Sequence, residues 1–415
     1  MNVRHAPHVI SRRHFLQRAT LGATAAAALP RLAAAQDEEA YWRLVKEQFP
    51  IRHNFTIMNA GNLCPSPYRV SEAVTHYTRD IDTDPSMQNR EKFEALAADT
   101  RAALARYVGA DPDEIAIVRN TTEGNNQVIT GLDLGPDDDV VIWDQNHPSN
   151  AEAWDVRAAR HGFEVHRVAV PDTSADASAL IAPFVERFTD RTRVVAFSHV
   201  SNISGIALPA RQLCTIARER GILTLIDGAQ TFGAHALDLH SIGCDFFTGS
   251  AHKWFMGPKE GGLLYVRREV VPRLWPAMVG IGWQNDLADA RRFETLGQRD
   301  DAMIAGILRG VEFLESIGRD VAESRTRALA GAVKAGIAES IHGATFKTPM
   351  ASELSGGVVV FALPGVNHAA AFEALYQDHG VGGALIGGSH LRLCPHLYNT
   401  MDEVARVVEV LGRFA

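Results

Sequence analysis

The sequence is poor in cysteine and has no long apolar run. Its 415 residues include four cysteines, Cys64, Cys214, Cys244 and Cys394, and no two stand at the short spacing of a metal-binding or redox-active pair. A metal centre is therefore not expected, while free thiols and disulfides both stay possible. No apolar segment reaches the ~18 residues that a membrane span needs. Hydrophobic residues make up 46% and charged residues 22%, as in ordinary soluble proteins, and the length suggests two packed domains.

The first 35 residues lack acidic side chains and contain five arginines. Ser11-Arg12-Arg13-His14-Phe15-Leu16 is a twin-arginine motif, an apolar segment follows from Leu21 to Leu29, and Ala33-Ala34-Ala35 offers small residues for cleavage. This order predicts a twin-arginine signal peptide over residues 1–35, recognised by the export machinery through Arg12 and Arg13, and a periplasmic mature protein. The alternative is a disordered N-terminus that carries an arginine pair by chance.

The mature chain is expected to be acidic. Removing residues 1–35 takes the formal charge from −8 to −13, because five positive charges leave with them. An acidic chain argues against binding nucleic acid through its phosphates.

Between residues 115 and 266, short β-rich runs alternate with amphipathic helical patterns. Such alternation predicts an α/β domain with a mostly parallel seven-stranded sheet and helices on both faces. The seven runs are Ile115–Val118, Val140–Trp143, Glu164–Val168, Arg193–Phe197, Ile222–Ile226, Asp245–Thr248 and Gly262–Val266. After about residue 300, long helical patterns precede strand signals at 357–363 and 391–394 and a last helix at 401–413. The sequence thus predicts an N-terminal arm with a large domain over 36–300, and a smaller α+β domain over 301–415.

Polar residues gather directly after five of the predicted strands, and in parallel sheets ligands bind beyond these carboxyl ends. The five segments are Asn120-Thr121-Thr122-Glu123-Gly124, Asn146-His147-Pro148, Ser198-His199-Val200-Ser201-Asn202, Asp227-Gly228-Ala229-Gln230 and Gly249-Ser250-Ala251-His252-Lys253. Each has an ordinary structural explanation: a helix cap, a turn, a loop histidine or a surface lysine. Together they predict one site with a phosphate-binding helix start, an imidazole, a carboxylate and a lysine.

The pairing of Asp227-Gly228-Ala229-Gln230 with Ser250-Ala251-His252-Lys253 resembles the class V aminotransferase family. These are fold-type-I pyridoxal-phosphate enzymes, which include cysteine desulfurases and isopenicillin N epimerases. The resemblance extends over roughly residues 50–410. It implies pyridoxal 5′-phosphate as the cofactor and the large and small domains of fold type I.

The resemblance also implies a role for each matching residue. Lys253 would hold the cofactor as a Schiff base and move protons at the substrate α-carbon, while Asp227 would keep the ring nitrogen protonated and His147 would stack on the ring. Asn202 and Gln230 would bind the phenolic oxygen, and Thr121, Thr122, Ser250 and His252 would bind the phosphate. Arg392 would bind the substrate carboxylate through two parallel hydrogen bonds, with Asn59 on a nearby substrate loop.

Two departures from the family pattern bear on function. The family usually has Gly-Thr where this chain has Gly297-Gln298, and that Thr reaches the phosphate of the partner subunit. Gln298 can donate a similar hydrogen bond, so a homodimer with sites near the interface stays the expectation. Desulfurases carry a nucleophilic cysteine shortly before the substrate-binding arginine, but Gly380 to Leu391 contains none. Persulfide chemistry is therefore disfavoured.

The leading expectation is transamination of an amino acid or a peptide-linked amino acid. The alternatives are epimerisation and C–S or β-elimination, because all three share the chemistry up to the carbanion. A pyridoxal-phosphate fold that binds without turnover is a further alternative, which the presence of Lys253, Asp227 and Arg392 opposes. A nicotinamide enzyme would need GxGxxG after the first strand, and Asn120 to Asn126 does not provide it.

Overall fold

The structure is a computed structural model that describes residues 38–171, 176–281 and 288–415. The predicted signal peptide at 1–35 lies outside the described residues. In the first half of the chain the elements are α2 Glu38–Lys46, β1 Thr56–Ile57, α3 Tyr68–Thr83, α4 Met87–Arg90, α5 Lys92–Val108, η1 Pro112–Glu114, β2 Ile115–Val118, α6 Thr121–Gly131, β3 Asp139–Trp143, α7 Pro148–His161, β4 Glu164–Val168, α8 Ala177–Arg187 and β5 Thr192–Ser198. In the second half they are α9 Ala210–Glu219, β6 Leu223–Asp227, α10 Leu239–Ile242, β7 Phe246–Ser250, β8 Gly262–Val266, η2 Arg268–Arg273, η3 Ala290–Glu294, α11 Asp301–Ile317, α12 Arg319–Ser340, β9 Thr345–Phe346, η4 Ser352–Leu354, β10 Val359–Ala362, α13 His368–Gln377, β11 Val381–Gly382, β12 Ala384–Ile386, β13 His390–Leu393 and α14 Met401–Gly412.

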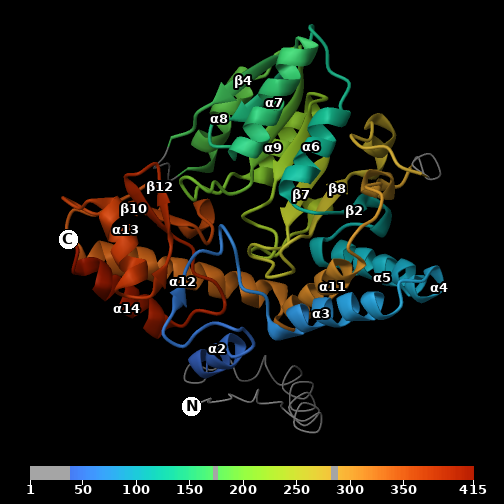
Figure 1. The fold of residues 1–415 in the computed structure, drawn as a ribbon. Helices are drawn as coiled ribbons and strands as arrows, with labels where there is room; N and C mark the ends of the chain where they lie inside the picture. The colour runs from blue at the N-terminus through green and yellow to red at the C-terminus, as the bar shows by residue number, and fades with distance from the viewer. Residues whose placement is uncertain (1–37, 172–175, 282–287) are drawn as a thin grey trace.

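A seven-stranded sheet forms the centre of the molecule (Figure 1). Its strand order is β2-β8-β7-β6-β5-β3-β4, and only β8 runs antiparallel to its neighbours. The seven predicted runs are the seven strands, so the expected mostly parallel sheet is confirmed. The central strands read as continuous apolar segments because helices bury both of their faces.

Two apolar cores cover the two faces of this sheet. On one face α8 and α9 pack through Leu180, Phe184 and Leu213. On the other face α6 and α7 pack through Ile129 and Trp154. Because β3, β5 and β6 are parallel neighbours, their carboxyl ends lie at one edge of the sheet, where ligands bind in such sheets.

A second sheet, with the order β12-β13-β10-β9, lies in the C-terminal part of the chain. One face of it packs with α12 and α14 around Leu391, Phe361 and Val407. The expected domain boundary at residue 300 stays a prediction, and α11, which follows it, packs against α3 and α5. Gly306 permits this approach, because a Cβ there would lie 2.7 Å from Val74 Cγ2.

The N-terminal arm is fastened to the C-terminal part. Trp42 of α2 is buried beneath the Arg325 guanidinium, whose carbon lies 5.0 Å from its ring. Further along, β1 pairs in parallel with β11, and Asn59 bridges to Cys394. The arm therefore carries Asn59 to Gly61 to the edge of the central sheet.

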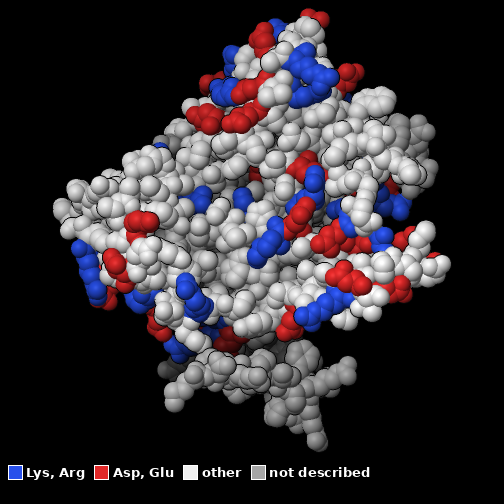
Figure 2. Space-filling view, in the orientation of Figure 1, with Lys and Arg blue, Asp and Glu red and all other residues white. Residues whose placement is uncertain are grey.

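Among the described residues, no helix combines the length and apolarity needed to cross a membrane. On the face shown in Figure 2, acidic and basic side chains are interspersed, for example over α3 and α5. The four cysteines are all buried and free, which answers the question that the sequence left open.

Candidate active site

The start of α6 forms the first wall of the site. Asn120 caps the helix by accepting from the Glu123 backbone N–H. The Thr121 N–H donates to Ser250 Oγ at 2.8 Å, and the Ser250 hydroxyl donates to Thr121 Oγ1 at 2.8 Å. This joins the helix start to the end of β7. A helix N-terminus with two hydroxyls is a ready anion site, as expected for a phosphate.

Asp227 closes β6 and is buried at the floor of the site. Its Oδ1 accepts from the Ala229 N–H at 3.0 Å, and its Oδ2 accepts from Asn125 Nδ2 at 2.8 Å. Asn125 in turn accepts from the Thr248 hydroxyl at 2.8 Å. Sequence reasoning missed Asn125 and Thr248. Asn125 stands one turn after Thr121, so the helical period could have placed it on the same face.

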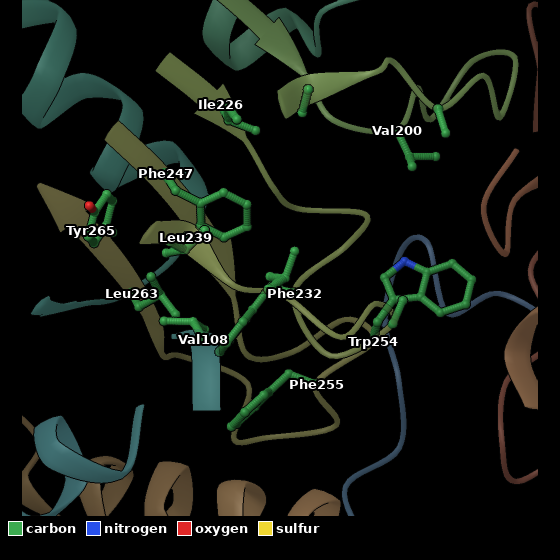
Figure 3. Close-up of a cluster of buried hydrophobic side chains, with 14 of the residues drawn as sticks. Val108, Val200, Ile226, Phe232, Leu239, Phe247, Trp254, Phe255, Leu263 and Tyr265 are labelled. Carbon is green, nitrogen blue, oxygen red and sulfur yellow. The ribbon is translucent and has the colours of Figure 1, made fainter. Parts of the chain in front are cut away.

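Lys253 lies on the loop after β7, and the next two residues anchor that loop. Trp254 and Phe255 are fully buried, and Phe255 stacks on Phe232 with ring centroids 4.4 Å apart (Figure 3). Burial lowers the pKa of the Lys253 ammonium, a change that the nearby Asp227 partly offsets and Arg392 increases. In the part of the chain that the structure describes, no hydrogen bond or ion pair engages the side-chain ammonium of Lys253. A lysine with a lowered pKa is a better nucleophile.

His147 caps α7 and borders the same space. Its Nδ1 accepts from the Ser149 N–H at 3.2 Å, which fixes the ring at the helix start. Desolvation is the main cause that lowers the pKa of His147; the charge on Lys253 also lowers it, and Asp227 opposes both. A neutral ring beside Lys253 and Asp227 fits the expected stacking role.

Arg392 projects from β13 and is buried. Its Nη1 donates to the Asn202 carbonyl at 3.1 Å and its Nη2 to Asn59 Oδ1 at 3.3 Å. Its Nε is buried and has no hydrogen-bond partner. Asn202 and Asn59 thus orient the guanidinium, and the unpaired N–H suits an anionic ligand.

Gln230 is buried and held at both ends of its carboxamide. Its Nε2 donates to the Gly61 carbonyl at 2.9 Å, and its Oε1 accepts from Trp254 Nε1 at 2.8 Å. One N–H of the amide stays available for the expected contact with the cofactor. Trp254 is fully buried and belongs to the core.

The remaining predicted residues differ in how close they lie to this centre. His252 is next to Lys253, its Nδ1 is buried without a partner, and burial lowers its pKa to about 4. Thr122 is exposed and lines a cavity of about 460 Å³ at the start of α6. Gln298 is exposed and donates to the Arg299 carbonyl, and among the described residues it makes no hydrogen bond to Thr121 or Thr122. The structure therefore does not bring Gln298 to the helix start of its own chain.

Another cluster of titratable groups lies elsewhere, at η1. Carboxylate or imidazole atoms of Asp111, Glu114 and His240 lie within 4.8 Å of one another. Arg268 pairs with Asp111, and its backbone N–H donates to Glu114. This cluster is an ion-pair network around Arg268.

The residues present at the main site fit pyridoxal phosphate. The start of α6 suits the phosphate, Asp227 suits the ring nitrogen, and Lys253 suits the aldehyde carbon. His252 Nδ1 and Arg392 Nε are buried and have no hydrogen-bond partner, which is also consistent with a polar ligand at the site.

Comparison with known proteins gives the same assignment. The family model described as aminotransferase class-V matches residues 63–407. The chain is 30% identical over 398 residues to an isopenicillin N epimerase of Streptomyces clavuligerus, a match that covers 92% of this chain and 98% of the relative. It is 28% identical over 377 residues to a cysteine desulfurase of Salmonella dublin, covering 83% and 87% of the two chains. A solved complex of the cystine C–S lyase C-DES with cysteine persulfide shares the fold, with a TM-score of 0.81 and 24% identity over 89% of this chain and 100% of that one.

These findings confirm the fold class, the expectation of an enzyme and the pyridoxal-phosphate cofactor that the sequence indicates. The family model covers most of the described chain, including β2 to β13 and every residue of the site except Asn59 and Gly61. The chain belongs to the class V aminotransferase family.

Proposed function

We propose that this enzyme moves the α-proton of an amino acid, free or peptide-linked, and transfers its amino group to the cofactor. The observation that carries the proposal is the convergence of Lys253, Asp227 and Arg392 at one edge of the sheet. Their charges act on one another, because Asp227 and Arg392 both shift the pKa of Lys253.

When bound, pyridoxal phosphate supplies an electron sink that stabilises negative charge at the substrate α-carbon. Asp227 would hold the ring nitrogen and keep it protonated. Lys253, whose pKa is lowered by burial, would accept the proton from the α-carbon and return it to the former aldehyde carbon of the cofactor. His147 would stack on the ring and restrict access of water.

Arg392 would bind the substrate carboxylate and set the orientation of the α-carbon before Lys253. Two of its nitrogens already hold Asn202 and Asn59, so the guanidinium plane is fixed. A fixed plane favours a planar carboxylate in one orientation. Asn202 and Gln230 would complete the contacts to the ring oxygen.

Transamination is favoured because it needs one proton-transferring group, and Lys253 supplies it. The hairpin between β12 and β13 contains Gly387 and Gly388 and no thiol, and Cys394 is fully buried. This supports neither a persulfide nor a cysteine nucleophile. Epimerisation is the second candidate, because the relative from Streptomyces clavuligerus is named an isopenicillin N epimerase.

A homodimer is also part of the proposal. Trp275, Val279 and Ile281 are exposed apolar side chains, with relative exposures of 63%, 66% and 106%. They lie in the same segment as Met278, which lines the cavity beside Thr122. A second copy covering this segment could bring its Gln298 to the start of α6.

Export by the twin-arginine route is proposed from the sequence alone. Fusing residues 1–35 to a reporter, with Arg12→Lys and Arg13→Lys together as the control, tests it. The reporter should reach the periplasm only with the arginine pair intact.

The test of function is the visible absorbance of the purified protein with pyridoxal phosphate, before and after adding a panel of amino acids. We expect a yellow band that converts to the amine form of the cofactor, with release of a keto acid. Lys253→Ala should lose both the band and turnover, with Lys259→Ala as the matched control. Loss of configuration without a keto acid would establish epimerisation, and activity that survives Lys253→Ala would refute the mechanism.

A further inference from the structure

The cluster beneath Asp227 contains two buried polar side chains to which neither the sequence nor the family resemblance assigned a role. The Thr248 hydroxyl donates to Asn125 Oδ1, and Asn125 Nδ2 donates to Asp227 Oδ2, both at 2.8 Å. Asn125 and Thr248 have no exposed surface, and Asp227 is 3% exposed. Water therefore does not compete for any of these bonds.

We infer that Asn125, oriented by Thr248, is a positioning residue that fixes the Asp227 carboxylate toward the ring nitrogen of the cofactor. The inference rests on the proposed function, because it assigns to Asp227 the role given above. It adds two residues and a direction for each hydrogen bond.

The direction of the bonds follows from their chemistry. A carboxylate can only accept, so Asn125 must turn its NH₂ group toward Asp227. Its carbonyl oxygen then faces Thr248, whose hydroxyl must donate. If the amide rotated by half a turn, its oxygen would face the carboxylate and that bond would be lost; in the observed orientation the Thr248 hydroxyl holds the amide oxygen in place.

Local packing explains why the two elements come this close. A Cβ on Gly124 would lie 2.8 Å from Thr248 Cγ2, so any larger residue would push α6 away from β7. The glycine thus permits the short Thr248–Asn125 bond. Gly124 therefore supports the Thr248–Asn125–Asp227 chain of hydrogen bonds only by leaving room for it.

The plane of the carboxylate is set by two donors on different oxygens. The Ala229 N–H holds Oδ1 at 3.0 Å, while Asn125 holds Oδ2. Among the described residues Asp227 forms no ion pair within contact distance, so neutral donors supply most of its direct stabilisation. Losing one of them would leave a buried charged oxygen without a partner and free the carboxylate to rotate.

Three variants test the inference. Asn125→Leu keeps the branched shape of the side chain and removes the donor, Thr248→Val removes the hydroxyl, and Thr248→Ser keeps the hydroxyl as the matched control. The measurements are the dissociation constant of pyridoxal phosphate, the pH midpoint of its visible band, and kcat and KM separately. Circular dichroism and thermal melting confirm that each variant folds.

We expect Asn125→Leu to weaken cofactor binding by roughly 10- to 100-fold and to move the pH midpoint of the band, since a buried charged acceptor loses its donor. Thr248→Val should cause a smaller change of the same kind, and Thr248→Ser should resemble the wild type. The value of kcat should fall while KM for the amino acid changes little. A purely structural role would lower the melting temperature and leave the pH midpoint in place.

The outcomes separate the two levels of the proposal. A wild-type protein without the visible band would refute the proposed function and this inference with it. A wild-type band together with unchanged pH midpoints and affinities in folded Asn125→Leu and Thr248→Val would refute the role of Asn125 alone. If Asn125→Leu does not fold, Thr248→Val and Thr248→Ser are compared by their cofactor affinities and pH midpoints. A difference between the two variants supports the inference, and equal values overturn it.

Discussion

Acidification should destabilise the protein through His199, the residue that directly follows β5. Its Nδ1 lies 3.2 Å from Thr231 Oγ1, and its ring centroid lies 5.8 Å from that of His235. Burial lowers the pKa of His199 to about 4, with Arg327 lowering it further and Glu323 opposing the change. The imidazole is therefore neutral in the folded protein near neutral pH.

The sign and size of the effect follow from linkage. An unfolded histidine has a pKa of about 6.5, so between that value and the folded pKa the unfolded chain binds more protons. The contribution of His199 is fully present above about pH 6.5 and is lost as the pH falls toward the folded value. At about pH 5 the loss is about 2 kcal/mol, because the unfolded imidazole is almost fully protonated and the folded one about a tenth.

The assay is urea unfolding of the wild type and of His199→Gln at about pH 7.5 and about pH 5. Fully buried histidines such as His396 lower the stability of both proteins in acid, so the comparison is the difference between the two losses. The wild type should lose about 2 kcal/mol more than His199→Gln between the two pH values. Equal losses would show that His199 is solvated or charged in the native state, contrary to the reasoning.

Two further predictions concern the substrate and the arm. Arg392→Lys should raise the KM for amino acids by roughly 10-fold or more with a smaller effect on kcat, because an ammonium cannot make the paired hydrogen bonds of a guanidinium. Initial rates at varied amino acid concentration measure both constants, and an unchanged KM would place the carboxylate elsewhere. Gly61→Ala should destabilise the protein by about 1–3 kcal/mol, since its Cβ would lie 2.9 Å from both Cys394 Sγ and Gln230 Oε1. Adding Cys394→Ala should recover part of that loss in thermal melting, and no recovery would mean that Gln230 alone causes the strain.

The central sheet could be predicted because each strand is a short apolar run bounded by polar turn residues. Ile115–Val118 and Gly262–Val266, for example, are strands over those same bounds. The strands of the C-terminal part were harder to predict, because β11 and β12 have only two and three residues and are too short to show an alternation of apolar and polar residues. The helix α13 was missed because His368–Gln377 is rich in alanine and buries only Ala371 and Leu375.

The polar edge of the site could be predicted because ligands bind beyond the carboxyl ends of parallel strands. Thr121, Asp227 and Lys253 all follow predicted strands in the sequence. Contacts made through the backbone could not be predicted this way. Asn202, for example, meets Arg392 through its carbonyl, which any residue possesses. Asn125 was missed because a buried polar residue inside a helix resembles an ordinary surface position in sequence.

The joining of the arm to the last strands has a consequence for the order of synthesis. Met58 and Ala60 receive their backbone partners from Gly382 and Cys394, more than three hundred positions later in the chain. A growing chain therefore leaves Met58 and Asn59 without these late partners until nearly all of it has emerged, and contacts of such separation form slowly. The substrate side of the pocket is thus completed last, so a nascent chain can bury its central sheet long before it can bind an amino acid.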